Sequence, residues 1–204
     1  MGSEMCIRDS YYGIRLYYGD DVIVENNEMS GYRDGLRIEQ VYTGTEVKNN
    51  NIHNNTNYGI YLYNVGNTNA RSNPIEITGN RFVDNNYGIY KSDSSNGYGY
   101  AHHIKDNLFK SQSTDGIYCY YYCREWTVEN NTFDGDSDQR YGFYMGRYGY
   151  KTIFGNNTFS DHTTKDLYFY YCYCTGTNAV QFFSNSYSSI NVTVSYTHLT
   201  LPTN

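Results

Sequence analysis

The sequence predicts an all-β solenoid, in which short strands of successive coils pair in parallel along one axis. A Gly-apolar-x-apolar unit recurs seven times, the last copy degenerate. A second unit, apolar-x-(Asn/Gly/Asp/Ser)-Asn-x-apolar, follows each copy by some eleven to eighteen residues. Successive copies of the first unit begin 22 to 29 residues apart. This spacing is too irregular for helical-repeat arrays and is typical of a strand solenoid with loops of varying length.

The first unit predicts one strand per coil, because its apolar residues alternate with the period of two that an extended chain requires. The side chains one and three residues after the glycine point inward, and the side chain between them points outward. In chain order the copies are 13–16, 35–38, 59–62, 88–91, 116–119, 142–145 and a degenerate 166–169, which begins with Asp166.

The second unit predicts a corner of the coil with a fixed asparagine. An asparagine side chain bonds to nearby backbone and tolerates the left-handed conformation that a tight corner requires. Stacked once per coil, roughly 4.8 Å apart, such asparagines can also bond to one another as a ladder. The predicted ladder residues are Asn27, Asn50, Asn80, Asn107, Asn131, Asn157 and Asn185.

This repeat resembles the right-handed parallel β-helix shared by pectate-lyase-like proteins and NosD-type repeat proteins. The resemblance covers nearly all of residues 11–193 and implies about seven coils around a narrow core of Ile, Val, Leu, Phe and Met. It also implies an extracellular, cell-surface or periplasmic location. We expect an uncapped fragment that behaves poorly when expressed alone, since a solenoid coil buries its faces only against its neighbours.

Both ends of the chain are expected to be translated sequencing adapter. Residues 5–10 can be encoded by ATGTGTATAAGAGACAG, and the reverse complement of that DNA encodes residues 193–198. Such an inverted pair is the signature of a transposase mosaic end, and adapter-derived segments are excluded from fold reasoning. The predicted organisation is an artefact at 1–10, a β-helix repeat domain at 11–193 that is a fragment of a longer protein, and a second artefact at about 194–204.

The charge of the chain argues against two classes of partner. Without Arg8, Glu4 and Asp9, the 15 basic and 21 acidic residues become 14 and 19, a net charge of −5. Binding to nucleic acid or to an anionic membrane needs clustered Lys and Arg, so neither partner is expected. No apolar run approaches the roughly 20 residues that span a bilayer, so no membrane insertion is expected either. The oligomeric state stays open.

The outward position of the first unit forms a column rich in tyrosine. Tyrosines on successive coils can stack sugar rings and hydrogen-bond to sugar hydroxyls, which makes a polysaccharide the expected partner. The other interpretation is an aromatic ladder that stiffens the sheet, and it is favoured because the chain has 27 tyrosines, many of them off this face. After Arg15, the candidate binding residues are Arg37, Glu39, Tyr61, Tyr90, Tyr118, Tyr144 and Tyr168.

The sequence identifies no catalytic residue. Glycoside hydrolysis uses two carboxylates roughly 5–10 Å apart, and the outward strand face offers Glu39 alone. Most of the other aspartates fall at predicted turns: Asp20, Asp21, Asp34, Asp84, Asp93, Asp115, Asp134, Asp136 and Asp138. The signature residues of polygalacturonases, pectate lyases and alginate epimerases are missing.

Two functions therefore stay open. The first is an extracytoplasmic surface scaffold or polysaccharide-binding platform. The alternative is a piece of a polysaccharide lyase, glycoside hydrolase or epimerase whose site lies partly outside the fragment.

No cofactor and no metal site are expected. His102 and His103 are adjacent on a strand and so point to opposite faces. Neither the Cys119/Cys123 pair nor the Cys172/Cys174 pair matches a zinc pattern. Cys119 takes an inward core position, and Cys123 and Cys172 lie two coils apart, beyond disulfide reach. Unless loops fold across, the four cysteines are expected to be free thiols, and their redox state stays open.

Overall fold

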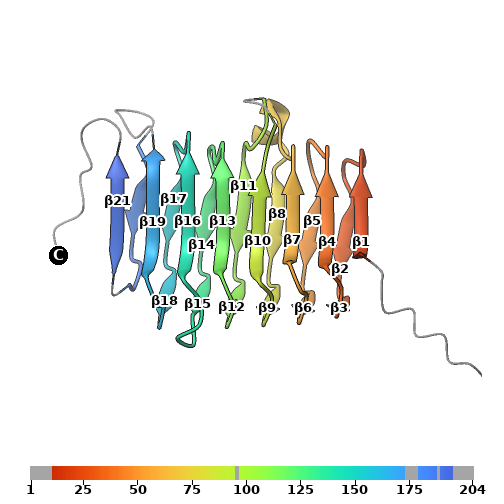
Figure 1. Cartoon of the computed structure of the whole chain (residues 1–204). Coiled ribbons are helices and arrows are strands. Elements are labelled where there is room, and N and C mark those ends of the chain that lie inside the picture. Colours follow the sequence, from red (N-terminus) through yellow and green to blue (C-terminus); the bar gives the residue numbers. More distant parts are fainter. Residues whose placement is uncertain (1–10, 95–96, 173–178, 188, 195–204) are drawn as a thin grey trace, which may run out of the picture.

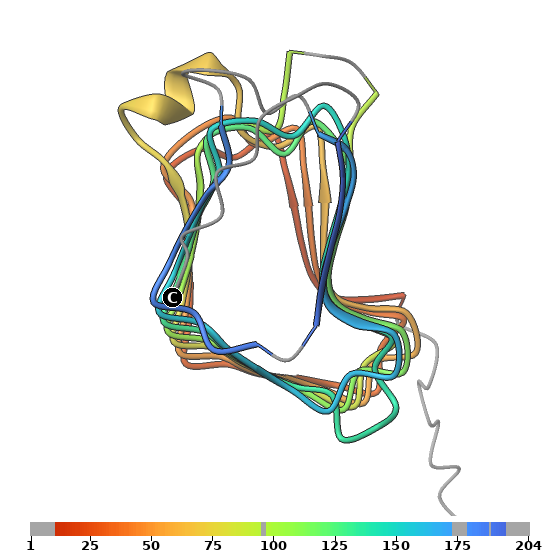
Figure 2. The ribbon, with the colours of Figure 1, turned by 90° about the vertical axis from the view of Figure 1, so that its left-hand side faces the viewer.

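The chain folds into a parallel β-solenoid of about six turns, close to the seven predicted (Figure 1). The computed structural model describes residues 11–94, 97–172, 179–187 and 189–194. Three sheets wrap around one core, and successive coils superpose when viewed along the axis (Figure 2). Residues 1–10 and 195–204, which contain nearly all of the expected adapter sequence, and Cys174 lie outside the described residues.

The first sheet contains the seven strands built from the glycine units, followed by β21, all parallel and in coil order. Neighbouring strands pair in register, so that equivalent positions of the repeat stack along the axis. The strands are β1 (Tyr12–Tyr17), β4 (Asp34–Glu39), β7 (Tyr58–Tyr63), β10 (Tyr87–Ser92), β13 (Asp115–Tyr121), β16 (Tyr141–Arg147), β19 (Lys165–Cys172) and β21 (Ile190–Val194).

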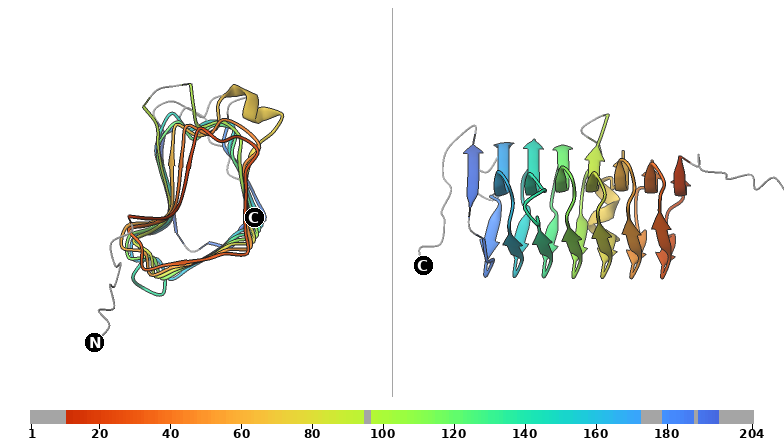
Figure 3. Two further views of the ribbon diagram at one scale, coloured as in Figure 1. Left: turned by 90° about the vertical axis from the view of Figure 1, so that its right-hand side faces the viewer. Right: turned by 60° about the horizontal axis from the view of Figure 1, so that its bottom comes forward.

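The second and third sheets contain the strands on either side of the asparagine corner, and the views in Figure 3 show them as evenly stacked coils. The second sheet consists of β2 (Ile23–Glu25), β5 (Glu46–Lys48), β8 (Ile75–Thr78), β11 (His102–Lys105), β14 (Thr127–Glu129), β17 (Ile153–Gly155) and β20 (Gln181–Phe183). The third consists of β3 (Glu28–Ser30), β6 (Asn51–His53), β9 (Arg81–Val83), β12 (Leu108–Lys110), β15 (Thr132–Asp134) and β18 (Thr158–Ser160). A 3-10 helix, η1 (Thr68–Arg71), projects from the coil after β7.

Like residues stack on like residues through the core. Phe82, Phe109, Phe133 and Phe159 of the third sheet form a pile with ring centroids 4.7, 4.7 and 4.5 Å apart. All four are buried. Because each ring covers the next at the coil spacing, the core is continuous along the axis.

The glycine of each first unit is explained by the close approach of neighbouring coils. A Cβ on Gly88 would lie 2.5 Å from the carbonyl oxygen of Gly116, and the same contact would arise at Gly13 and Gly59 with the glycine of the next coil. Any side chain at these positions would therefore push two coils apart.

The asparagines of the second unit form a ladder along the corner. Each Asn side chain donates from Nδ2 to the Oδ1 of the next coil's Asn at 2.8–3.1 Å, from Asn27 through to Asn185. The left-handed residue at this corner is the one before the ladder asparagine, as at Asn49 and Asn130 with φ of 55° and 56°. The sequence interpretation assigned that backbone role to the ladder asparagine itself, which is incorrect by one residue.

A second polar ladder was not predicted. Asn55, Asn85, Gln112 and Gln139 stack at the next corner, where the Oδ1 of Asn85 accepts from the Nδ2 of Asn55 at 2.9 Å. The Oε1 atoms of the two glutamines accept from the backbone N–H of the preceding member at 3.1 and 3.3 Å. The sequence signal was present, because an Asn or Gln follows the ladder asparagine by five residues in three consecutive coils.

Candidate functional site

Five tyrosines of the predicted binding column lie on the outward face of the first sheet, one per strand. Strand register places each beside its equivalent on the next coil. Consecutive ring centroids are 5.9, 5.2, 4.5 and 5.4 Å apart, and the interplanar angles are 10°, 15°, 11° and 18°. We call Tyr61, Tyr90, Tyr118, Tyr144 and Tyr168 the tyrosine row.

The rings of the tyrosine row stack on one another. Because their spacing is close to the coil rise of about 4.8 Å, the ring planes lie across the solenoid axis and each ring covers its neighbour. Other tyrosines pack alongside the row, such as Tyr58, whose centroid is 4.6 Å from that of Tyr90. The row therefore presents ring edges and phenol hydroxyls, whereas the flat stacking of sugars that the sequence suggested would need exposed ring faces.

The hydroxyls of Tyr90, Tyr118 and Tyr144 in the middle of the row are protonated at neutral pH. Burial raises the pKa of Tyr90 and of Tyr144 to about 12, and it raises the pKa of Tyr118 as well. A neutral phenol both donates and accepts hydrogen bonds. The middle of the row thus presents uncharged hydrogen-bonding groups.

The other two predicted binding residues, Arg37 and Glu39, lie at the β4 end of the row inside an ion-pair network. Arg37 lies over the ring of Tyr61 at 4.2 Å and donates to Asp34 and to Glu39, both at 3.0 Å. Arg15 donates to Glu39 from Nε at 2.7 Å. Burial opposes ionisation of Glu39, but the hydrogen bonds from Arg37 and Arg15 outweigh it and hold the pKa of Glu39 below its usual value.

Three aspartates that the sequence placed at ordinary turns are buried, which corrects that interpretation. Asp34 and Asp115 begin β4 and β13, because these strands start one residue before the glycine unit. Asp115 accepts from Arg140 at 3.1 and 2.8 Å, and Asp93 is ion-paired within the core. The carboxylates on this face, Asp34, Glu39 and Asp115, are thus each paired with an arginine, which disfavours a catalytic carboxylate pair there.

The expectation of free thiols is wrong for Cys119 and Cys123, which form a disulfide with their Cα atoms 6.3 Å apart. β13 ends at Tyr121, and Tyr122 adopts a left-handed φ of 59°, which turns the chain so that both cysteines point inward. Both are fully buried. The coil spacing excludes a disulfide between distant coils, but it does not exclude one formed by a turn within a single coil.

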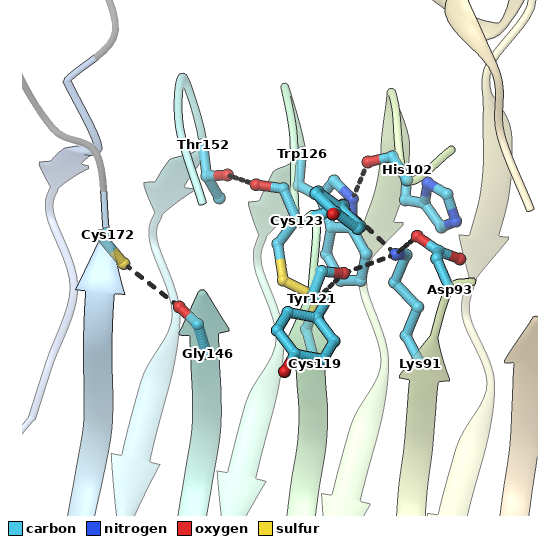
Figure 4. The surroundings of a disulfide bond; sticks show 12 residues. Lys91, Asp93, His102, Cys119, Tyr121, Cys123, Trp126, Gly146, Thr152 and Cys172 are labelled. Carbon is cyan, nitrogen blue, oxygen red and sulfur yellow. Dashed lines mark hydrogen bonds and ion pairs between the residues drawn. A yellow bond between two sulfur atoms is a disulfide. The ribbon is translucent and has the colours of Figure 1, made fainter. Parts of the chain in front are cut away.

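A charged layer lies beside this disulfide in the otherwise apolar core (Figure 4). Lys91 is fully buried, forms an ion pair with Asp93, and donates to the carbonyl oxygens of Tyr121 and Tyr122 at 2.9 and 3.2 Å. Asp93 also accepts from the backbone N–H of Asn64 at 3.0 Å. Burial lowers the pKa of Lys91 and raises that of Asp93, which is the expected response to desolvation.

His102 adds a neutral imidazole to this layer. Its ring stacks on Trp126 at 4.7 Å, and its Nδ1 donates to the carbonyl oxygen of Tyr100 at 3.0 Å. Burial, and then the Lys91 ammonium, lower the pKa of His102 to about 3. The Nε2 atom is buried without a hydrogen-bond partner within the described part of the chain.

Sulfur-containing side chains also lie in this part of the core. Among the described residues, no group of three or more His, Cys, Asp and Glu side chains is placed to hold a metal ion. Cys119 and Cys123 bring two sulfurs together, and Met145 is the inward register partner of Cys119 on the next coil.

Two family models match the chain. A model described as periplasmic copper-binding protein (NosD) matches residues 63–195, and a model described as right handed beta helix region matches residues 3–76. Comparison with curated proteins and with solved structures finds no significant match. Within the described ranges, no helix is both long and apolar enough to cross a membrane.

Proposed function

The chain belongs to the family described as periplasmic copper-binding protein (NosD), an extracytoplasmic type of β-helix protein, and we propose that its tyrosine row is a binding platform for a linear polysaccharide. The β-helix serves in this proposal as a rigid scaffold that holds the row straight. The observation that carries the proposal is the in-register row of five stacked tyrosines on one outward face.

The spacing and chemistry of the row favour an extended, hydroxyl-rich polymer. Five hydroxyls repeat at the coil rise and so extend over roughly 20 Å along the axis. Each hydroxyl can donate to and accept from a sugar hydroxyl, and tyrosine combines this with an apolar body. The arginines at the β4 end are already paired with carboxylates, so the surface favours a neutral polymer over a charged one.

The test is binding of neutral polysaccharides to the wild type and to two pairs of variants. Tyr90→Ala with Tyr118→Ala removes two rings from the middle of the row and should abolish binding. Tyr90→Phe with Tyr118→Phe keeps the stack but removes two hydroxyls, and should weaken binding about tenfold or more if each lost hydrogen bond contributes about 1 kcal/mol.

The matched control is Tyr42→Phe, because Tyr42 stacks on Tyr98 in a corner loop away from the row. Binding by the control should equal that of the wild type. The absence of binding to any polysaccharide by the wild type, or equal binding by the alanine pair, would contradict the platform.

A further inference from the structure

We propose that a sugar ring, carried as a branch on the polysaccharide, inserts between the rings of Tyr63 and Tyr120 and lies above Ser92. This inference rests on the proposed function, because the branch belongs to the polymer that the tyrosine row binds. It deepens that function by naming the class of polymer, a neutral chain with single-sugar branches. We call the space between the two rings the slot.

The slot lies in the column of outward side chains next to the tyrosine row, two residues further along each strand. Strand register places Ser92 beside Tyr63 of the preceding coil. The pairing of β10 with β13 places Ser92 level with Tyr120 of the following coil. The coil between the two tyrosines therefore has a small side chain at the position where its neighbours have rings.

The two rings that bound the slot are nearly parallel. The interplanar angle between Tyr63 and Tyr61 of the row is 12°, and the angle between Tyr120 and Tyr118 of the row is 11°. The planes of the row itself lie across the solenoid axis and differ by 10° and 15° between these coils. The faces of Tyr63 and Tyr120 are thus turned toward each other along the axis.

The slot is wide enough for one further ring. Tyr63 and Tyr120 are two coils apart, which corresponds to roughly 9.6 Å by strand spacing. A ring midway between them would lie about 4.8 Å from each, close to the 4.5–5.9 Å that separates ring centroids in the tyrosine row. Tyr120 is 39% exposed, which agrees with an uncovered ring face. A guest ring would take the place of the tyrosine that this coil lacks.

A neutral pyranose suits both the walls and the edges of the slot. The C–H groups of a sugar pack on aromatic faces, and tyrosine combines such a face with a hydroxyl. The ring edge of Tyr90 borders the slot on the row side, and Ser92 forms its floor. The hydroxyls of both residues can donate to and accept from the hydroxyls at the edge of a sugar ring.

The orientation of the slot requires a branch and not a unit of the main chain. In an extended polysaccharide that follows the solenoid axis, the ring planes run along that axis. A ring in the slot lies across the axis, as the tyrosine rings do. A sugar attached to the side of the main chain can turn into this orientation while the main chain stays on the row.

A second gap follows the first at a regular distance. Gly146 directly follows Met145, the register partner of Cys119, and so lies level with Tyr120 on the next coil. It leaves the other face of Tyr120 without a ring beside it. The positions of Ser92 and Gly146 are two coils apart, again roughly 9.6 Å, which favours a polymer with branches at regular intervals.

The experiment compares branched polysaccharides with their unbranched backbones on the full chain. Galactomannan is measured against linear mannan, and xyloglucan against cello-oligosaccharides, by isothermal titration calorimetry. The wild type should bind the branched member of at least one pair about tenfold more tightly or more, because two aromatic faces cover the branch. In NMR spectra of the bound ligand, the C–H protons of the branch should shift upfield under the ring currents of the two tyrosines.

Two variants change the slot and leave the tyrosine row in place. Ser92→Tyr fills the slot with a ring and should remove the preference for the branched polymer without weakening the unbranched one. Tyr120→Ala removes one wall and should reduce the same preference. The matched control is Tyr187→Ala, since Tyr187 is 37% exposed but follows β20 and lies off the first sheet. Circular dichroism confirms the β-fold of each variant.

The outcomes separate the slot from the platform. Equal binding of branched and unbranched polymers by the wild type, or an unchanged preference in Ser92→Tyr, would overturn the slot while the platform stands. Failure of both branched polymers to bind would overturn the slot as well. The platform itself fails in the separate case in which no polysaccharide binds.

Discussion

At the scale of single residues, Lys91 is the largest departure from the repeat. It takes the inward position that Leu62 and Cys119 take on the two neighbouring coils. A buried ammonium is tolerated there because Asp93 and two backbone carbonyls replace its water. Such a pair is weak evidence for stability, since desolvation offsets most of the attraction, but breaking it leaves an uncompensated charge.

We therefore expect Lys91→Met to lower the free energy of unfolding by about 3–5 kcal/mol, because Asp93 is left buried without its partner. Adding Asp93→Asn should recover much of that loss, since the amide is neutral and can still accept from Asn64. Urea unfolding followed by circular dichroism measures the free energy of unfolding of the single and the double variant. If the double variant is less stable than Lys91→Met alone, the buried charge is not the cause.

Because His102 is buried in its neutral form, we expect the free energy of unfolding to depend on pH. The pKa of His102 in the folded state, about 3, lies below its ordinary value of 6.5. Its contribution to the free energy of unfolding is therefore fully present above pH 6.5. It is lost as the pH falls toward 3, because the unfolded state binds the proton first. The slope from this group is about 1.4 kcal/mol per pH unit. His102→Phe keeps a ring against Trp126 and should remove that component.

The measurement is urea unfolding of wild type and His102→Phe at several pH values between 4 and 7. The stability of the wild type should fall relative to that of His102→Phe as the pH falls. Parallel curves would show that His102 titrates normally in the folded protein.

At the scale of elements, the strands and corners explain why the fold could be predicted. The glycine units coincide with strands of the first sheet, because Gly88 and its equivalents leave no room for a Cβ. Period-two alternation separates inward from outward positions, and strand register then stacks them. These signals are local and repeat in every coil.

The site was predicted less well, for physical reasons. The tyrosine row could be located from alternation, but ring orientation depends on side-chain packing that a pattern does not encode. The burial of Asp93 depends on Lys91, a single residue in one coil, and averaging over repeats hides it. The Cys119–Cys123 disulfide depends on one left-handed residue, Tyr122, of a type that rarely adopts that conformation.

The asparagine ladder predicts a large cost for removing one member. In Asn107→Ala the backbone N–H and the Nδ2 of Asn80 lose their acceptor, and the carbonyl of Ile77 loses its donor. Leaving such buried groups unsatisfied should lower the free energy of unfolding by roughly 2–5 kcal/mol.

The control for the ladder is Thr132→Ala, an exposed position on the adjacent coil, which should change stability by less than about 0.5 kcal/mol. Denaturant unfolding compares the two variants. A loss for Asn107→Ala no larger than for Thr132→Ala would show that the ladder bonds exchange with water.

At the scale of the whole molecule, stability is set by contacts between neighbouring coils. Some side-chain contacts reach further, and the strongest of them is an ion pair: Arg71 of η1 donates to Glu125 at 2.6 and 2.7 Å, across the intervening coil. The hydrogen bond from Arg71 lowers the pKa of Glu125. This pair joins three coils on the side where the loops project.

Hydrogen exchange should reflect this one-dimensional arrangement. Among the described strands, β1 pairs with β4 alone, whereas β10 is flanked by β7 and β13. Amides of β1 should therefore exchange at least about 100-fold faster than those of β10, because local opening of an edge strand breaks fewer contacts. Exchange measured by mass spectrometry with peptide resolution tests this, and uniform rates along the chain would indicate unfolding as one unit.

Among the described residues Lys91 is the one buried lysine, and this affects which strand register the coils adopt during folding. Because the coils are nearly identical, the chain could misfold by a register shift, in which one coil takes the position of the next and most contacts still form. If the coil that carries Lys91 were shifted by one position, its ammonium would be buried without Asp93 and without the carbonyl oxygens of the Tyr121 corner. A single buried charge thus disfavours the shifted arrangements and specifies one register for a repetitive chain.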